Sequence, residues 1–316
     1  MKGSYRGLLR FGKIAIIGLA LGWGCTATHP GQGDAPYRVI DTHTHFWDLG
    51  RPIPPGRPTA VPFSNGRTVL PDEYVKSAKV AGISGTVVVE ASGWVEDNEW
   101  VLVQARSSPI IVGVIGNLNE VLGTPRFPEV LSKLSADPLF RGIRLGRAED
   151  LAKPAWRDHL AVLANKGLAV DLNASGVSAV EAAAANAPLF PGLKIVLDHS
   201  GYIEFCKEPS PEWIRAMTSA ARFPNLYCKV SRFQEQAGVQ PAPGDVEAYR
   251  RTLNLLWTSF GEDRLMFGSN WPLSEKGGTL ADAVAIMKAY FGEKGERASR
   301  KFFSGNAKTV YRWVDR

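Results

Sequence analysis

Residues 38–48 read RVIDTHTHFWD, a short β-branched run that ends on two closely spaced histidines. Seven more short runs rich in β-branched or apolar residues follow it along the chain. They occupy residues 85–90, 110–115, 142–145, 168–172, 193–199, 226–231 and 264–269. Runs of this kind, apolar on both faces and bounded by turn residues, are typical of strands buried in a parallel sheet. The sequence therefore predicts about eight strands.

Helical spacing fills the stretches between these runs. It is clearest at residues 71–80, 156–166 and 177–186, where the first begins with a proline and the first two are followed by glycine. Strands that alternate with helices form a parallel sheet, because each crossover must cover a sheet face. We therefore expect an α/β fold, a single (β/α)8 TIM-type barrel over residues 38–316. The alternative is a doubly wound open sheet, but no Gly-rich phosphate loop follows any predicted strand.

The composition is that of an ordinary globular protein. The chain has 316 residues, of which 45% are hydrophobic and 22% charged, and this excludes a disordered chain, a collagen and a coiled coil. The net charge is +6, but Lys2, Arg6, Arg10 and Lys13 precede Cys25 without any acid, so the rest carries only +2. We therefore expect no nucleic-acid partner.

The N-terminus has the pattern of an export signal. Its cations precede the apolar run Ile14–Trp23, which is too short to span a bilayer but has the length of a signal-peptide core. We expect residues 1–25 to be a signal peptide and the protein to be exported, either periplasmic or a membrane-anchored lipoprotein. Two alternatives stay open: lipidation at Cys25, which would be the only membrane contact, or cleavage near Ala27 or Ala35.

Residues 26–37 are polar and rich in Gly and Pro, and we interpret them as a flexible tether. Beyond the tether the only cysteines are Cys206 and Cys228, too few for a disulfide scaffold. Strand alternation that turns Lys229 and Ser231 inward turns Cys228 outward. We therefore expect no disulfide between the two cysteines.

Histidines at strand ends are the first candidates for chemistry. A period of two places Asp41, His43 and His45 on one face of the first strand, near the mouth where barrel active sites are built. His199 ends the run at 193–199 and is the third inward candidate. His159 falls within a predicted helix, and we expect it on a solvated face.

Several segments together resemble one family. They are VIDTHTHFWD, TVVVEAS followed by EDNEW, IVGVIGNLN, GIRLG, IVLDHSG, NLYCKVS, RLMFGSNWP and FFSGNAKTVYRW. An HxH pair alone is a weak signal, but HxH, a later LDHSG and a late FGSxWP in this order are specific. The chain resembles the amidohydrolase superfamily, in particular its lactonases that act on sugar lactones such as fuconolactone and on pyrone dicarboxylates.

The resemblance implies a role for His43, His45 and His199. In relatives that use a metal, the matching histidines are metal ligands, whereas in the pyrone lactonases they orient and polarise the substrate carbonyl without one. Both alternatives stay open here, and the cofactor would be one divalent ion such as Zn²⁺ or none. A two-metal centre is not expected, because the fourth strand offers Arg144 rather than a bridging lysine and the fifth strand has no histidine.

Asn270 departs from the family pattern. The FGSxWP segment usually carries Asp, which takes the proton of the attacking water, and an amide has no such capacity. Glu90 and His199 are alternative bases, or a metal-bound hydroxide would remove the need for one. Asn270 would then hydrogen-bond the water.

Cationic residues at strand ends are candidates for substrate binding. Arg144 and Arg232 have planar guanidiniums that suit a carboxylate or a lactone oxygen. Lys229 and Ser231 share an inward face, and a lysine inside a barrel needs a carboxylate neighbour.

Three tryptophans, Trp47, Trp94 and Trp271, follow strands and would either stack on a sugar ring or pack in the core. Together these residues predict a hydrolase that opens the lactone of a sugar acid or related organic acid by water attack at the barrel mouth. The alternatives are a metal-dependent amidohydrolase or decarboxylase on the same fold, and a barrel that binds a small molecule without turning it over.

Overall fold

The structure is a computed structural model that describes residues 1, 3, 37–57 and 66–316. The predicted signal peptide, including Cys25, and most of the tether lie outside the described residues. Residues 37–316 form one compact unit by themselves.

Eight parallel strands form one sheet in the order of the sequence, and each predicted run overlaps one of them. They are β1 (Ile40–Thr44), β2 (Gly85–Val89), β3 (Ile111–Gly116), β4 (Phe140–Leu145), β5 (Ala169–Leu172), β6 (Ile195–Leu197), β7 (Leu226–Val230) and β8 (Leu265–Phe267). The segment after β8 returns to β1 and pairs with it through two backbone hydrogen bonds. The backbone N–H of Asn270 donates to the His43 carbonyl at 2.8 Å, and the backbone N–H of His45 donates to the Trp271 carbonyl at 2.9 Å. These bonds bring the two edges of the sheet together.

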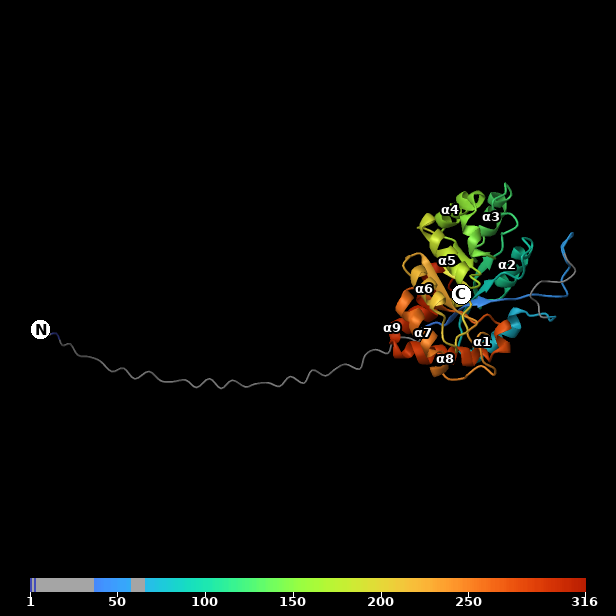
Figure 1. Cartoon of the computed structure of the whole chain (residues 1–316). Coiled ribbons are helices and arrows are strands. Elements are labelled where there is room, and N and C mark those ends of the chain that lie inside the picture. Colours follow the sequence, from blue (N-terminus) through green and yellow to red (C-terminus); the bar gives the residue numbers. More distant parts are fainter. Residues whose placement is uncertain (2, 4–36, 58–65) are drawn as a thin grey trace. The chain divides into compact units, whose positions relative to one another are not determined.

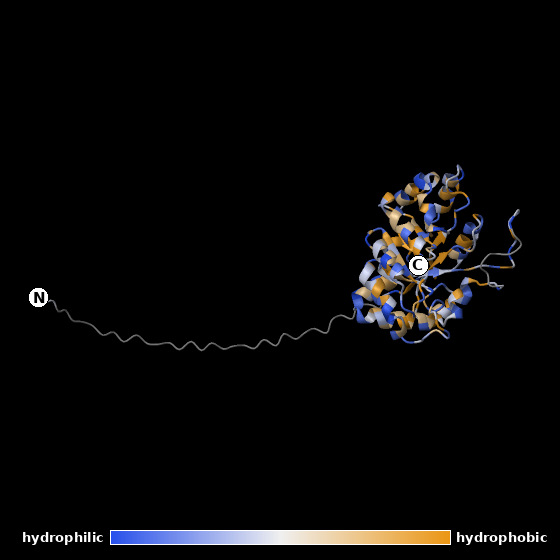
Figure 2. Cartoon of the chain, viewed as in Figure 1, coloured by the Kyte–Doolittle hydropathy of each residue, from blue (hydrophilic) through white to orange (hydrophobic). Residues whose placement is uncertain are grey.

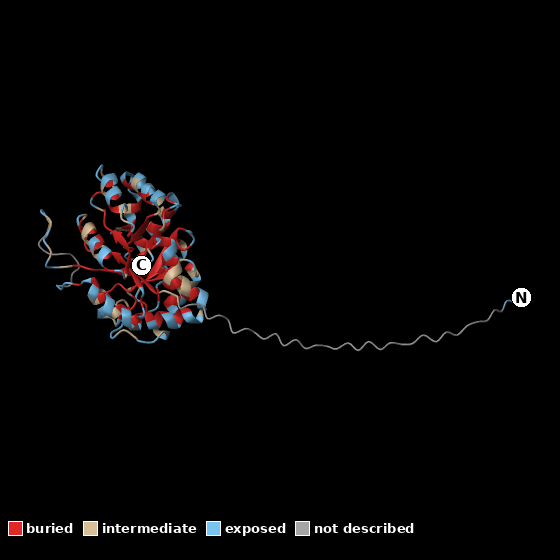
Figure 3. Ribbon diagram, turned by 180° about the vertical axis from the view of Figure 1, so that it is seen from behind, coloured by how far each residue is buried: buried red, intermediate tan, exposed pale blue. Residues whose placement is uncertain are grey.

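A helix follows each strand, and Figure 1 shows the helices arranged around the sheet. They are α1 (Pro71–Ala81), α2 (Asp97–Ser107), α3 (Phe127–Ser135), α4 (Arg157–Lys166), α5 (Val177–Asn186), α6 (Pro211–Ala220), α7 (Glu247–Phe260) and α8 (Leu280–Glu293). The strands are buried and the outer helix faces are exposed (Figure 3), and apolar residues concentrate on the strands and the inner helix faces (Figure 2). The prediction of a single (β/α)8 barrel is confirmed.

Local signals set the helix ends. Pro71 occupies the first turn of α1, where its missing N–H costs no hydrogen bond. Gly82 ends α1 with a φ of 71°, and Gly167 ends α4 with a φ of 65°, a left-handed conformation that glycine adopts without steric cost.

Strict alternation fails within β1. The pairing with β2 shifts between Asp41 and Thr44, so the strand carries an irregularity. As a result Asp41 does not share a face with His43 and His45. Its carboxylate instead accepts hydrogen bonds from Tyr74 of α1 at 3.0 Å and from the Ser269 hydroxyl at 2.5 Å, on the helix side of the sheet.

The C-terminal segment packs against the inside of the barrel. It comprises α9 (Glu296–Arg300), a π-helical turn (Lys301–Gly305) and α10 (Asn306–Tyr311). Val310 and Tyr311 cluster with inward residues of the strands such as Ile40 and Met266. The Tyr311 hydroxyl donates to Asp171 Oδ1 at 2.8 Å, so this segment also supports a buried carboxylate of β5.

Cys228 lies where the sequence predicts, and His159 does not. Cys206 and Cys228 are not bonded to each other, and Cys228 packs in the apolar layer between strands and helices, as the alternation predicted. The solvated face predicted for His159 is wrong: its ring stacks on Phe127 with centroids 4.2 Å apart, and its Nδ1 accepts from the Gly123 amide. Among the residues that the structure describes, no helix has the length and apolarity needed to cross a membrane.

Tyr311→Phe tests the support of the barrel interior. The change keeps the ring and removes one hydrogen bond to the buried Asp171, so we expect a loss of about 1–3 kcal/mol in the free energy of unfolding. Urea denaturation followed by circular dichroism measures it. Tyr227→Phe is the control, because that hydroxyl contacts only the half-buried Lys194. Equal stabilities for wild type and Tyr311→Phe would contradict this role.

Candidate active site

A cavity of about 260 Å³ opens at the carboxyl ends of the strands, the end at which barrel active sites are built. Most of the residues predicted for the site line it: His45, Glu90, Arg144, His199, Arg232 and Asn270, together with Trp47. Asn117, Asn173 and Tyr202 add polar groups that the sequence analysis did not select. The cavity is small and combines these polar groups with apolar surface, and it suits a molecule with a single ring.

Strained backbone is concentrated around this cavity. His199, Tyr202, Arg232 and Asn270 all have positive φ values, from 55° to 70°, which non-glycine residues rarely adopt. His199 does not belong to β6, which ends at Leu197, but to the turn that follows. Clustered strain of this kind is typical of sites where the backbone is held in place for function.

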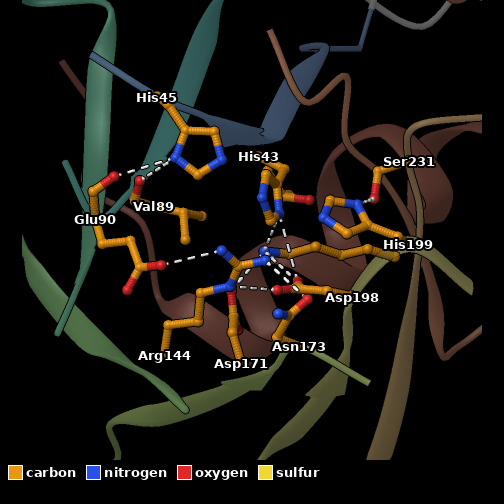
Figure 4. Close-up of polar contacts among 12 residues, drawn as sticks. His43, His45, Val89, Glu90, Arg144, Asp171, Asn173, Asp198, His199 and Ser231 are labelled. Carbon is orange, nitrogen blue, oxygen red and sulfur yellow. Dashed lines mark hydrogen bonds and ion pairs between the residues drawn. The ribbon is translucent and has the colours of Figure 1, made fainter. Parts of the chain in front are cut away.

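The His45 ring has a fixed tautomer. Its Nδ1 lies 2.7 Å from the Val89 carbonyl and 3.1 Å from the Glu90 carbonyl, and carbonyl oxygens only accept (Figure 4). Nδ1 therefore carries the proton. The opposite nitrogen, Nε2, is left as an acceptor, so neutral His45 cannot polarise a substrate carbonyl by donating to it.

Arg144 lies between two carboxylates (Figure 4). Its Nη1 is 3.0 Å from Glu90 Oε1, and its Nε is 2.9 Å from Asp198 Oδ2. The other oxygen of Glu90 accepts from the Asn117 amide at 2.6 Å. Both oxygens of Glu90 are thus engaged, which makes this residue a weak candidate for the base.

Lys229 lies beneath the cavity, with no exposed surface. Its Nζ is 2.5 Å from Asp171 Oδ2, 3.4 Å from Asp198 Oδ1 and 3.3 Å from His43 Nδ1. The ammonium has the carboxylate neighbour that the sequence predicted, and in fact has two. Neither Lys229 nor the buried Ser231, whose Oγ lies 2.8 Å from His199 Nδ1, lines the cavity, so both support the site instead of contacting substrate.

The three histidines are neutral at physiological pH. Burial lowers the pKa of His45 to about 4, with Arg144 contributing. Burial also lowers the pKa of His43, aided by Lys229, and that of His199, aided by His43, well below the usual value. The site therefore offers uncharged imidazoles next to fixed cations.

The carboxyl groups differ from one another. Burial raises the pKa of Glu90 and, to about 6, that of Asp171. Burial acts in the same direction on Asp198, but Lys229 and Arg144 outweigh it and hold the pKa of Asp198 below its usual value. Lys229 and Arg144 thus favour the ionised form of Asp198 at the centre of the site.

One group of side chains could hold a metal ion. Ligand atoms of His43, Asp198 and His199 all lie within 4.8 Å of one another. His43 Nε2 is buried and has no hydrogen-bond partner among the described residues, as expected of a nitrogen available for coordination. Two imidazoles and a carboxylate form a donor set that zinc accepts. His45, expected as the third ligand, lies outside this group and Asp198 takes its place.

Of the three tryptophans that follow strands, Trp47 lines the cavity and Trp94 and Trp271 do not. Trp47 lines the cavity, with its ring near that of His45, and its Nε1 donates to the Arg67 carbonyl. Trp271 is 1% exposed, packs against Tyr74 with ring centroids 5.1 Å apart, and belongs to the core. Only Trp47 is therefore placed to touch a substrate.

Besides Asn117 and Asn173, the sequence left three polar residues of the site unpredicted. Asp198 precedes His199 in LDHSG, and an acid at the end of an apolar strand was a usable signal. Tyr202 follows the same motif and its hydroxyl donates to Asn173 Oδ1. Glu235, which accepts from the Asn270 amide at 2.9 Å, lies in a loop where no motif marks it.

Comparison with known proteins identifies the family of the chain. The amidohydrolase family model matches residues 40–313. An L-fucono-1,5-lactonase of Burkholderia ambifaria is 32% identical over 290 residues, which cover 88% of this chain and 96% of that protein.

Two solved structures share the fold. An amidohydrolase from Burkholderia multivorans with bound zinc has a TM-score of 0.76 at 20% identity, covering 88% of this chain and all of that one. A probable 2-pyrone-4,6-dicarboxylic acid hydrolase from Acinetobacter baumannii with bound citric acid has a TM-score of 0.68 at 18% identity, covering 87% and 99%. The family match over nearly the whole barrel, together with the lactonase relative, shows that the chain belongs to the amidohydrolase family.

Proposed function

We propose that the protein hydrolyses the lactone of a sugar acid or a related organic acid. The observation that carries this proposal is the cavity itself, where the acceptor nitrogen of a neutral imidazole, His45, faces the same space as two guanidiniums, Arg144 and Arg232. The L-fucono-1,5-lactonase relative supports the reaction class. The small volume of the cavity supports a substrate with one ring.

The guanidiniums bind the oxygens of the substrate. Arg144 is fixed by its two carboxylate partners, and Arg232 lies over the Tyr202 ring at 5.1 Å with 29% of its side chain exposed. A positive charge held in place stabilises the negative oxygen that forms when water attacks a carbonyl, because the charge needs no reorganisation.

His45 accepts the proton of the attacking water. The water oxygen bonds to the carbonyl carbon while one proton passes to Nε2, and the imidazolium is held by the backbone carbonyls at Nδ1. The ring C–O bond then breaks and the leaving oxygen takes that proton, giving an open-chain hydroxy acid. With a pKa of about 4, His45 is about as basic as an ordinary carboxylate. It can therefore take the place of the Asp that the family pattern has where this chain has Asn270.

We further propose that His43, Asp198 and His199 bind one zinc ion. Zinc bound there would supply a Lewis acid toward the substrate carbonyl. The residues of the chain keep their own roles: Ser231 orients the His199 ring, and Lys229 and Arg144 hold Asp198.

Export also remains part of the proposal. Residues 1–25 would be the signal peptide, residues 26–37 the tether, and the lactone would be met outside the cytoplasm. Any membrane contact would come from a lipid at Cys25.

Hydrolysis of a panel of five- and six-membered sugar-acid lactones tests the reaction. We expect turnover by wild type, and His45→Gln should lower kcat by about 10² to 10⁴, the usual contribution of a general base. His159→Gln is the matched control, because this histidine lies outside the cavity and should be dispensable. Wild-type protein that binds a hydroxy acid but opens no lactone would favour the non-catalytic alternative.

Metal analysis after equilibration with Zn²⁺ and dialysis tests the zinc site. The expected content is one ion per chain for wild type and for His45→Gln, and none for His199→Gln. Of these two histidines, His199 belongs to the proposed ligand group and His45 does not. Zinc that persists in His199→Gln, or is lost equally from both variants, would contradict this assignment.

A further inference from the structure

Asn270 makes an unusual contact for a residue that lines the cavity. Its Nδ2 donates to both oxygens of Glu235, at 2.9 Å to Oε1 and 3.3 Å to Oε2. Glu235 is 8% exposed and its Oε2 also lies 3.3 Å from Arg232 Nε. Two residues that line the cavity therefore share one carboxylate.

Glu235 fixes the orientation of the Asn270 amide. An ionised carboxylate only accepts hydrogen bonds, so the NH₂ group must face it and the carbonyl oxygen Oδ1 must face the other way. Glu235 is not among the residues that line the cavity of the histidines, whereas Asn270 is. Glu235 instead lines a neighbouring cavity. Tyr202 is the one residue that lines both cavities.

Asn270 is also held next to His45. The Asn270 backbone amide bonds to the His43 carbonyl, and the His45 amide bonds to the Trp271 carbonyl. The φ of 70° at Asn270 fixes the direction in which its side chain leaves the backbone. Both side chains therefore enter the same cavity from adjacent, hydrogen-bonded segments.

A water molecule has two O–H donors, and a water that is to attack needs both occupied so that a lone pair points at the carbonyl carbon. His45 Nε2 is one acceptor. We propose that Asn270 Oδ1 is the second, and that Glu235 is the positioning residue that turns this oxygen toward the water. This inference rests on the proposed function, and it assigns Glu235 no direct contact with substrate.

The proton balance is unchanged by this role. One water proton passes to His45 Nε2 and returns to the leaving oxygen, while the other stays on the attacking oxygen, hydrogen-bonded to Asn270. Glu235 neither gains nor loses a proton. Its loss should therefore lower kcat and leave KM and the pH dependence unchanged.

A double-mutant cycle tests the proposal. In Glu235→Gln, the glutamine can present either its NH₂ group or its carbonyl oxygen to Asn270, so the side-chain amide of Asn270 is no longer held in one orientation. We expect kcat to fall about tenfold to a hundredfold at constant KM. Asn270→Gly removes the side-chain amide, and glycine tolerates the positive φ at this position. In the Asn270→Gly background, Glu235→Gln should have no further effect.

Two more variants sharpen the result. In Asn270→Asp/Glu235→Gln, the new glutamine donates to one aspartate oxygen and leaves the other as an acceptor, so kcat should recover relative to Glu235→Gln. Asn270→Asp alone places two carboxylates in contact and should bring no gain over wild type. Glu204→Gln is the control, because Glu204 lines the neighbouring cavity and pairs with Lys207.

The outcomes separate this inference from the proposed function. An active wild type whose kcat is unaffected by Glu235→Gln overturns the role of Glu235 alone. A loss of the same size in the Asn270→Gly background also overturns it, because Glu235 would then act through Arg232. An inactive wild type overturns the proposed function and with it the water-holding role. The amide orientation is then decided by the side-chain NMR signals of Asn270, which should shift in Glu235→Gln and not in Glu204→Gln.

Discussion

The buried carboxylate of Asp198 is the constraint on which the rest of the site depends. It has no exposed surface, and it lies against Arg144 at 2.9 Å and against Lys229 and His43 at 3.4 Å. An unpaired charge at this depth would cost several kcal/mol. The two cations must therefore stay where they are, and their positions fix those of Glu90, Asp171 and the histidine rings.

This arrangement determines the chemistry at the mouth of the barrel. Burial keeps the imidazoles neutral by lowering their pKa values, and the neighbouring guanidinium and ammonium groups add to this effect. Neutral His45, with its Nδ1 proton committed to backbone carbonyls, has an acceptor nitrogen free. Strained turns at His199 and Asn270 then direct their side chains into the cavity from the ends of β6 and β8.

The sequence was sufficient for the fold and for most residues of the cavity. Alternating runs of strand and helix predicted the barrel. The position of His43, His45, Arg144 and Asn270 within the last residues of strands or just after them predicted their convergence, because parallel strands end on one side. The period of two did not predict the direction of Asp41 in β1, because a register shift turns this side chain away from the histidines. Glu235 lay beyond prediction, because its contact with Asn270 joins a loop to a strand end and leaves no periodic signal.

The central claim is that a lactone lies between His45 and the two guanidiniums with its carbonyl carbon open to attack. A crystal structure of His45→Gln with an intact sugar-acid lactone tests this most directly. The account predicts lactone oxygens within hydrogen-bond distance of Arg144 or Arg232, and a water against Asn270 Oδ1 that faces the carbonyl carbon. A lactone bound outside this cavity, or with its carbonyl carbon turned away from residue 45, would contradict it.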